Sequence, residues 1–125
     1  MKIFVIGSYK ENTSKGTKAN IAKANNAGIE IMKKGHLPLV PQSMLAGWED
    51  KLEMEQIMQT CFKWIEECDA VLILNIGSEN GGTARAKKHA VKTGKIIYHA
   101  LEEIPSIISL KFATCSNVRP PSTLL

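Results

Sequence analysis

The chain of 125 residues has few cysteines and few aromatic residues, and it has no long apolar run. Cys61 and Cys68 lie seven residues apart on a predicted helix, about 10 Å along its axis, which is too far for a disulfide. No CxxC pair or Cys/His cluster indicates a metal site. The apolar run from Met1 to Gly7 is too short for a signal peptide or a membrane span. We therefore expect a cytoplasmic protein in a reducing compartment, without metal, cofactor or membrane association.

Two nucleotide-binding motifs are also missing. The chain contains no GxxxxGK[ST] sequence after a strand and no GxGxxG fingerprint, which argues against ordinary nucleotide triphosphatase chemistry. The formal net charge is +4, but the lysines are scattered, and the only basic cluster runs from Arg85 to His89 with few aromatics near it. This pattern argues against a nucleic-acid partner. The cluster is best explained as a solvated helix face, and a basic rim around an anionic ligand is the second explanation.

Four short apolar runs alternate with helical stretches, a pattern typical of β-α-β units. The runs are Lys2 to Gly7, His36 to Val40, Ala70 to Asn75 and Lys95 to His99. We predict an α/β fold with an open, mainly parallel sheet of four or five strands and helices on both faces, Rossmann-like with flavodoxin-like strand order. The length suits one domain, residues 1–109, followed by an extension, residues 110–125, that is either loose or packed on a partner subunit.

Three helices are predicted between the strands. The first runs from Thr17 to Lys34 and ends at the cap residue Gly35. The second carries an apolar stripe from Met54 to Cys68 at three-four spacing, which must lie on the sheet. The third runs from Thr83 to Thr93, and its small residues permit a close approach to the sheet.

Ligands of open parallel sheets bind outside the carboxyl ends of the strands. The glycine-rich turn from Ser78 to Thr83 joins the third predicted strand to a helix, where glycines allow a phosphate or sugar hydroxyl to approach the backbone. The alternative is a plain turn that needs glycine for a positive φ angle.

Two aromatic residues lie in other loops at this edge. Trp48, in a loop predicted from Pro41 to Trp48, could stack on a base, although a hydrophobic lid explains it slightly better. Tyr9 could stack or donate its hydroxyl. His36 and His99 are interpreted as structural, and His89 as part of the basic helix face. Asp69 is interpreted as a turn residue at the wrong end of its strand for ligand binding.

Five segments of the chain occur in a characteristic order. They are Lys2 to Ser8, Gly35 to Pro41, Glu67 to Leu74, Gly82 to Ala86 and Ile97 to Pro105. Their order and spacing resemble the nucleoside 2-deoxyribosyltransferase superfamily and its small relatives of unknown function. Members of that superfamily cleave or transfer an N-glycosidic bond, and a glutamate in the helix after the glycine turn attacks the sugar carbon.

The resemblance places this nucleophile three residues after Thr83, at Ala86, and two further acidic positions of the family fall on Cys61 and Asn80. Alanine cannot attack a sugar. The resemblance therefore implies a protein that binds a nucleoside, a nucleotide or a related ribosylated ligand without turnover. The implied ligand-binding residues are Gly7, Ser8, Tyr9, Trp48, Ser78, Asn80, Gly81, Gly82 and Thr83, and Arg85 could favour anionic ligands.

Two other functions stay open. The first is an N-glycosidic hydrolase or deoxyribosyltransferase that uses a different carboxylate, either Glu79 or Asp50. The second is an oligomeric scaffold that binds partners through its apolar C-terminal tail. In each case a small α/β domain of this kind is expected to form a homo-oligomer.

Overall fold

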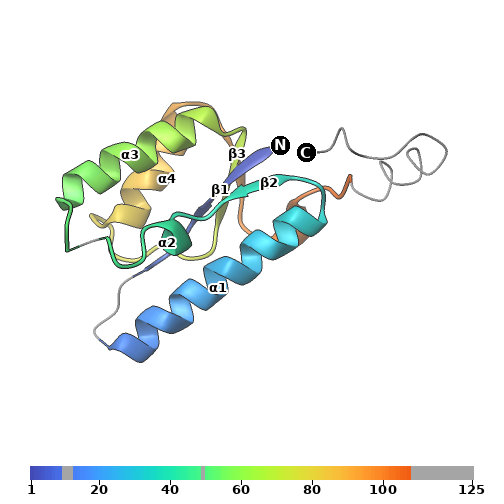
Figure 1. Cartoon of the computed structure of the whole chain (residues 1–125). Helices are drawn as coiled ribbons and strands as arrows, with labels where there is room; N and C mark the ends of the chain where they lie inside the picture. The colour runs from blue at the N-terminus through green and yellow to red at the C-terminus, as the bar shows by residue number, and fades with distance from the viewer. Residues whose placement is uncertain (10–12, 49, 108–125) are drawn as a thin grey trace, which may run out of the picture.

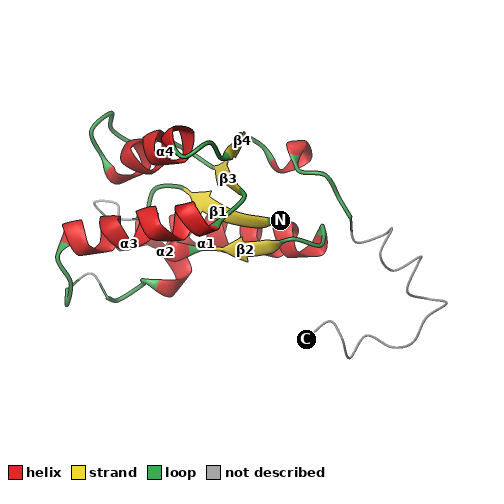
Figure 2. Ribbon diagram, turned by 90° about the horizontal axis from the view of Figure 1, so that it is seen from above, coloured by secondary structure: helices red, strands yellow, loops and turns green. Residues whose placement is uncertain are grey.

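The computed structural model describes residues 1–9, 13–48 and 50–107, and its centre is a four-stranded parallel sheet. The strands are β1 (Lys2–Ile6), β2 (Leu37–Leu39), β3 (Ala70–Ile73) and β4 (Ile96–Tyr98), in the order β2-β1-β3-β4. Figure 2 shows this order across the sheet. The order matches the first four strands of a flavodoxin-like sheet and confirms the predicted fold class. The predicted extension, residues 110–125, lies outside the described residues.

Helices cover both faces of the sheet, as predicted (Figure 1). Helix α1 (Ser14–Lys33) lies on one face, together with a short 3₁₀ helix (Leu101–Glu103). Helices α3 (Met54–Glu67) and α4 (Gly82–Lys92) lie on the other face. None of the described helices combines the length and apolar character needed to cross a membrane.

The alternation of side chains along each strand explains why the buried parts of the central strands are apolar on both faces. Phe4 of β1 and Val71 of β3 pack against α3 and α4, whereas Val5 and Leu72 point to the α1 side. All four are at most 2% exposed. Because both faces are covered, the buried positions of these strands, Ile3 to Ile6 and Ala70 to Ile73, are all apolar, whereas Lys2 at the start of β1 is exposed.

The structure corrects several predicted boundaries. The strands are one or two residues shorter than predicted at their ends. Helix α1 begins at Ser14 rather than Thr17, because Thr13 Oγ1 accepts a hydrogen bond of 3.0 Å from the Gly16 N–H and caps an earlier turn. Part of the predicted loop after β2 is a short helix, α2 (Pro41–Met44), which has its proline in the first turn.

His36 joins the N-terminus to the last described segment. Its Nδ1 lies 2.9 Å from the Met1 amino group and its Nε2 lies 2.6 Å from the Pro105 carbonyl oxygen. The carbonyl can only accept, so Nε2 carries the proton and Nδ1 accepts from Met1. His36 is 3% exposed, and its contacts agree with the structural role expected from the sequence. Asp69 likewise accepts a hydrogen bond from the Lys2 N–H, at the amino end of the sheet.

Candidate functional site

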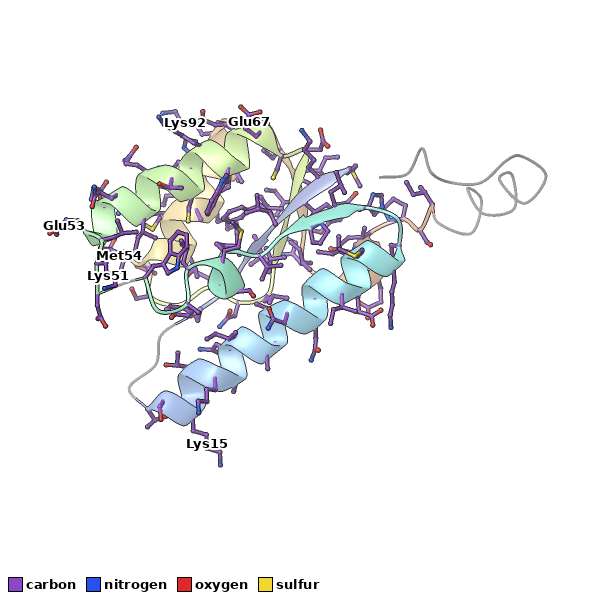
Figure 3. The ribbon with its side chains drawn as sticks, in the orientation of Figure 1. Lys15, Lys51, Glu53, Met54, Glu67 and Lys92 are labelled. Atoms are coloured by element: carbon purple, nitrogen blue, oxygen red, sulfur yellow. The ribbon has the colours of Figure 1, made fainter. Side chains whose placement is uncertain are left out.

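A cavity of about 500 Å³ opens at the carboxyl edge of the sheet. Its wall comes from β1, α2, α3, the start of α4 and the loops between them. Met54, labelled in Figure 3 near Lys51 and Glu53, lines it where α3 begins. The lining residues are Phe4, Val5, Ile6, Gly7, Ser8, Tyr9, Pro41, Gln42, Leu45, Asp50, Leu52, Met54, Ile57, Met58, Cys61, Gly77, Ser78, Gly81, Gly82, Thr83 and Ala86.

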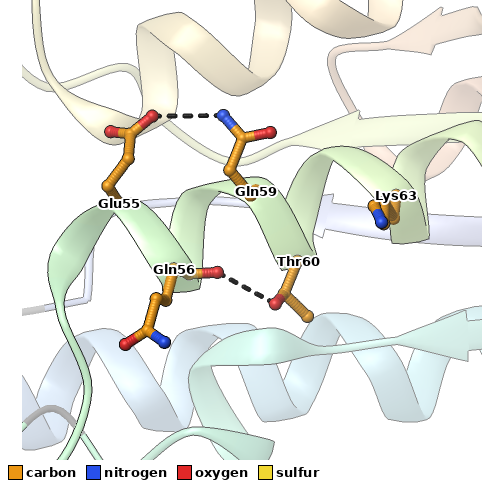
Figure 4. A pocket seen from close by; sticks show the side chains of 5 residues that line it. All are labelled: Glu55, Gln56, Gln59, Thr60 and Lys63. Carbon is orange, nitrogen blue, oxygen red and sulfur yellow. Dashed lines mark hydrogen bonds between the residues drawn. The ribbon is translucent and has the colours of Figure 1, made fainter.

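A second hollow of about 400 Å³ lies on the outer face of α3 (Figure 4). All of its side chains are exposed, and two of its contacts stay within the helix. Gln59 Nε2 donates to Glu55 Oε1 at 3.1 Å, and Thr60 Oγ1 donates to the Gln56 carbonyl at 2.9 Å. A solvated helix face explains this hollow, so the cavity at the sheet edge is the candidate site.

The glycine-rich turn forms one side of the cavity. The positive-φ glycines of the described chain are Gly35, Gly47 and Gly94, so the glycines of this turn are not required for a left-handed backbone. Their neighbours leave little room for a larger side chain. A Cβ added to Gly81 would lie 3.0 Å from Ser78 Oγ, and one added to Gly82 would lie 3.1 Å from Met58 Sδ. The interpretation as a plain positive-φ turn is therefore wrong, and the turn packs tightly against Ser78 and Met58 instead.

Two hydroxyl groups flank the turn with their oxygen atoms already accepting hydrogen bonds. Ser8 Oγ accepts from Asn75 Nδ2 at 3.0 Å, while Asn75 Oδ1 accepts from the Ser8 N–H at 2.9 Å. Thr83 Oγ1 accepts from the Gly77 N–H at 2.8 Å. A Cβ added to Gly77 would lie 3.6 Å from both hydroxyl oxygens. Each hydroxyl keeps its own proton, so both can donate to an acceptor in the cavity.

The beginning of α4 adds backbone donors to the same side of the cavity. The helix starts at Gly82, and no side chain caps it. The first N–H groups of a helix have no acceptor within the helix, and they attract negative charge. Together with the two hydroxyls, they make this side of the cavity a hydrogen-bond donor surface.

Gln42 of α2 also lines the cavity and is 5% exposed. Its Nε2 donates to the Gly7 carbonyl at 3.0 Å and to the Val5 carbonyl at 3.4 Å. Its Oε1 is buried and has no hydrogen-bond partner among the described residues. Sequence reasoning missed Gln42 as a site residue. The available signal was a polar side chain three residues after β2, at the carboxyl edge of the sheet.

The floor of the cavity is apolar where the resemblance places the nucleophile. Ala86 is 5% exposed and packs in the same core cluster as Phe4 and Cys61. Burial raises the pKa of the Cys61 thiol to about 11, so this group is neutral at ordinary pH. Neither Ala86 nor Cys61 therefore supplies a nucleophile in this conformation.

The structure separates the two carboxylates that were proposed to replace a nucleophile. Asp50 lines the cavity, whereas Glu79 does not. Arg85 also turns away from the cavity and binds Glu55 with two hydrogen bonds of 3.1 and 2.9 Å. The hydrogen bonds to Arg85 lower the pKa of Glu55, and those to Glu55 raise the pKa of Arg85. Arg85 is therefore paired with Glu55 of α3 and is not part of the cavity lining.

The cavity brings together most of the residues predicted to bind a ligand. Its lining includes Gly7, Ser8, Tyr9, Ser78, Gly81, Gly82 and Thr83. Asn80 and Trp48 are not part of the lining, and Trp48 is 52% exposed. The lining group comes from two loops about 70 residues apart in the sequence, which the pairing of β1 with β3 places side by side.

Comparison with known proteins finds a similar solved structure. No protein-family model matches the chain, and no curated protein matches it in sequence. The structure of a CMP N-glycosidase from Clostridium botulinum, BcmB, superimposes with a TM-score of 0.51. The two chains are 17% identical over 95% of this chain and 85% of that chain. What they share is the fold. The likeness therefore supports the α/β architecture and leaves the role of the cavity to be argued from its own residues.

Proposed function

We propose that this protein binds a nucleoside or nucleoside monophosphate in the cavity at the sheet edge and leaves the N-glycosidic bond intact. The observation that supports this proposal most strongly is the alanine at position 86. It lies in the apolar floor of the cavity, at the position where the resemblance to deoxyribosyltransferases expects a glutamate nucleophile. A pocket that keeps its polar wall but lacks the attacking group is suited to binding.

The size and polarity of the cavity support a ligand of this class. A volume of about 500 Å³ falls in the range of small-molecule sites, which are mostly apolar with a few placed polar groups. The hydroxyls of Ser8 and Thr83 and the first N–H groups of α4 suit a sugar hydroxyl or a phosphate. The apolar side chains of Ile57 and Met58 suit a base. The similar structure is that of an enzyme named for CMP, a ligand of this kind.

A second candidate function is hydrolysis or transfer at the N-glycosidic bond with Asp50 as the reacting carboxylate. Asp50 lines the cavity, which is the observation that favours it over Glu79. Asp50 is exposed, however, and it lies in the loop before α3 rather than in the floor beside Ala86. Binding without cleavage therefore ranks first.

One experiment separates the two functions. The protein is mixed with ribonucleosides, deoxyribonucleosides and their 5′-monophosphates, and each mixture is examined for a melting shift and, by chromatography, for free base. We expect a melting shift with no free base. Base release by the wild-type protein that Asp50→Asn abolishes would instead establish the second function. No melting shift with any of these compounds would contradict both.

A matched pair of variants tests whether binding uses this cavity. Ser8→Ala removes a hydroxyl of the cavity wall, and Ser106→Ala removes an exposed one that does not line it. Loss of a neutral hydrogen bond should weaken binding about fivefold in Ser8→Ala and leave Ser106→Ala unchanged. Equal affinity of the two variants in calorimetric titration would show that the ligand binds elsewhere.

A further inference from the structure

The side chain of Asn75 continues the pairing of β1 with β3 past the ends of the two strands. The strands pair up to Ile6 and Ile73, and the Leu74 N–H then donates to the Ile6 carbonyl at 2.8 Å. In this register Asn75 lies opposite Ser8. Its Oδ1 accepts from the Ser8 N–H at 2.9 Å and replaces the backbone carbonyl that would accept this N–H in a longer ladder. Asn75 therefore ties the loop after β1 to the loop after β3.

The same amide also determines the role of the Ser8 hydroxyl. The Ser8 N–H can only donate, so it fixes which atom of the amide is Oδ1, and Nδ2 then donates to Ser8 Oγ at 3.0 Å. The hydroxyl turns its own proton away from Asn75, and no acceptor among the described residues takes that proton. Ser8 lines the cavity, whereas Asn75 does not. Ser8 thus presents a donor to the cavity, and the group that orients it lies outside the lining.

The glycine before Ser8 leaves room for this amide. A Cβ added to Gly7 would lie 3.2 Å from Asn75 Oδ1 and 3.3 Å from Leu74 Cβ, and both distances are shorter than ordinary van der Waals contacts. A larger residue at position 7 would therefore displace the amide from the end of β1. The close fit and the two hydrogen bonds together hold Asn75 in one orientation beside Ser8.

We propose, on the basis of the binding function above, that Asn75 is a positioning residue that acts on the ligand only through Ser8. It keeps the Ser8 hydroxyl as a donor, so this part of the wall takes a ligand oxygen that accepts a hydrogen bond. A sugar oxygen and a phosphate oxygen share this chemistry. An oriented hydroxyl binds better than a freely rotating one, because less freedom is lost on binding and the hydrogen bond that it accepts polarises it.

A double-mutant cycle on ligand affinity tests the action through Ser8. The probe is the compound with the largest melting shift among adenosine, guanosine, cytidine, uridine and their 5′-monophosphates, titrated calorimetrically. Asn75→Ala should weaken binding about threefold in the wild-type chain and should have no effect in a chain that already carries Ser8→Ala. Equal weakening in both chains, or none in either, would overturn the proposal. Failure of the wild-type protein to bind any of these compounds would instead contradict the binding function.

The comparison of a nucleoside with its 5′-monophosphate identifies the ligand oxygen that Ser8 binds. If this atom belongs to the phosphate, Asn75→Ala weakens binding of the monophosphate alone. If it belongs to the sugar, Asn75→Ala weakens binding of both compounds by the same factor. Either result agrees with the proposal, provided that the weakening disappears in the Ser8→Ala chain.

A second variant keeps the shape of the side chain and removes its donor. In Asn75→Asp the carboxylate still accepts from the Ser8 N–H, but its other oxygen takes the Ser8 hydroxyl proton, so binding should weaken about fivefold, as in Ser8→Ala. Added to Ser8→Ala, the same change should have no further effect, whereas repulsion of an anionic ligand would persist. Asn26→Asp on the exposed face of α1 should keep the wild-type affinity.

Wild-type affinity in Asn75→Asp, with circular dichroism showing that the variant is folded, would overturn the proposal. If this variant is unfolded, the double-mutant cycle with Asn75→Ala decides the question.

Discussion

Raising the pH above 9 should destabilise the protein through Cys61. The folded chain holds this thiol in the cavity floor at 8% exposure, where burial raises its pKa to about 11. In the unfolded chain a cysteine titrates near its usual value, about 8.5 to 9. Between pH 9 and pH 11 the unfolded chain therefore loses a proton that the folded chain keeps. Stability must fall as the pH rises through this interval, and the thiol contributes no pH dependence well below it.

The size of the effect follows from the shift in pKa. Each unit is equivalent to 1.36 kcal/mol, so a shift of about two units makes the free energy of unfolding roughly 2–3 kcal/mol smaller at pH 11 than at pH 8. Changes of charge elsewhere on the chain are common to all variants. The measurement is therefore the difference in the free energy of unfolding between the wild-type protein and Cys61→Ala, obtained by urea unfolding at several pH values.

Cys61→Ala should start less stable at pH 8, because it leaves a small cavity, and should then lose less stability than the wild-type protein as the pH rises. Cys68→Ala is a second test of the same argument, because burial, the largest cause, also raises the pKa of Cys68. Parallel curves for the wild-type protein and Cys61→Ala would refute the argument, because they would mean that the folded and unfolded chains release this proton at the same pH.

Three further substitutions test the packing around the site, each by urea unfolding. Gly28→Ala should cost roughly 1–3 kcal/mol, because the new Cβ would lie 2.8 Å from Val40 Cγ2, and Val40→Ala in the same chain should recover part of this loss. Thr83→Val should cost about 1 kcal/mol and speed hydrogen exchange at the Gly77 N–H, whose acceptor it removes. Ile65→Ala, at 0% exposure on the buried side of α3, should cost about 2–5 kcal/mol, and a loss below 1 kcal/mol would contradict the described core.

The sequence was sufficient to predict the fold class because the controlling signals are local. Apolar runs of strand length alternate with helical stretches, and a buried parallel strand needs apolar residues on both faces. The stripe on α3 identified the side of that helix that lies on the sheet, and Cys61 and Ile65 are buried there. Helix boundaries were less accurate. The early start of α1 depends on the Thr13 side chain, a single capping contact.

The position of the site was also partly predictable. Parallel strands bring their carboxyl ends to one edge, so the loop after β1 and the loop after β3 had to meet there. The absence of a glutamate at Ala86 is a property of the sequence, although its meaning depends on a family resemblance. Gln42 was missed because its importance comes from one unpaired atom, which only contacts in three dimensions reveal.

Three features follow from the sequence alone. They are the alternation of apolar runs and helices that requires a parallel sheet covered on both faces, the glycine-rich turn at the edge of that sheet, and the alanine at position 86. Only the tertiary structure decided that Asp50 faces the cavity, that Arg85 binds Glu55 thirty residues away, and that the Gln42 amide is fixed by β1. The physical reason is the range of the interactions. Apolar periodicity acts within one element, whereas the direction of a polar side chain depends on partners that the packing of distant elements places beside it.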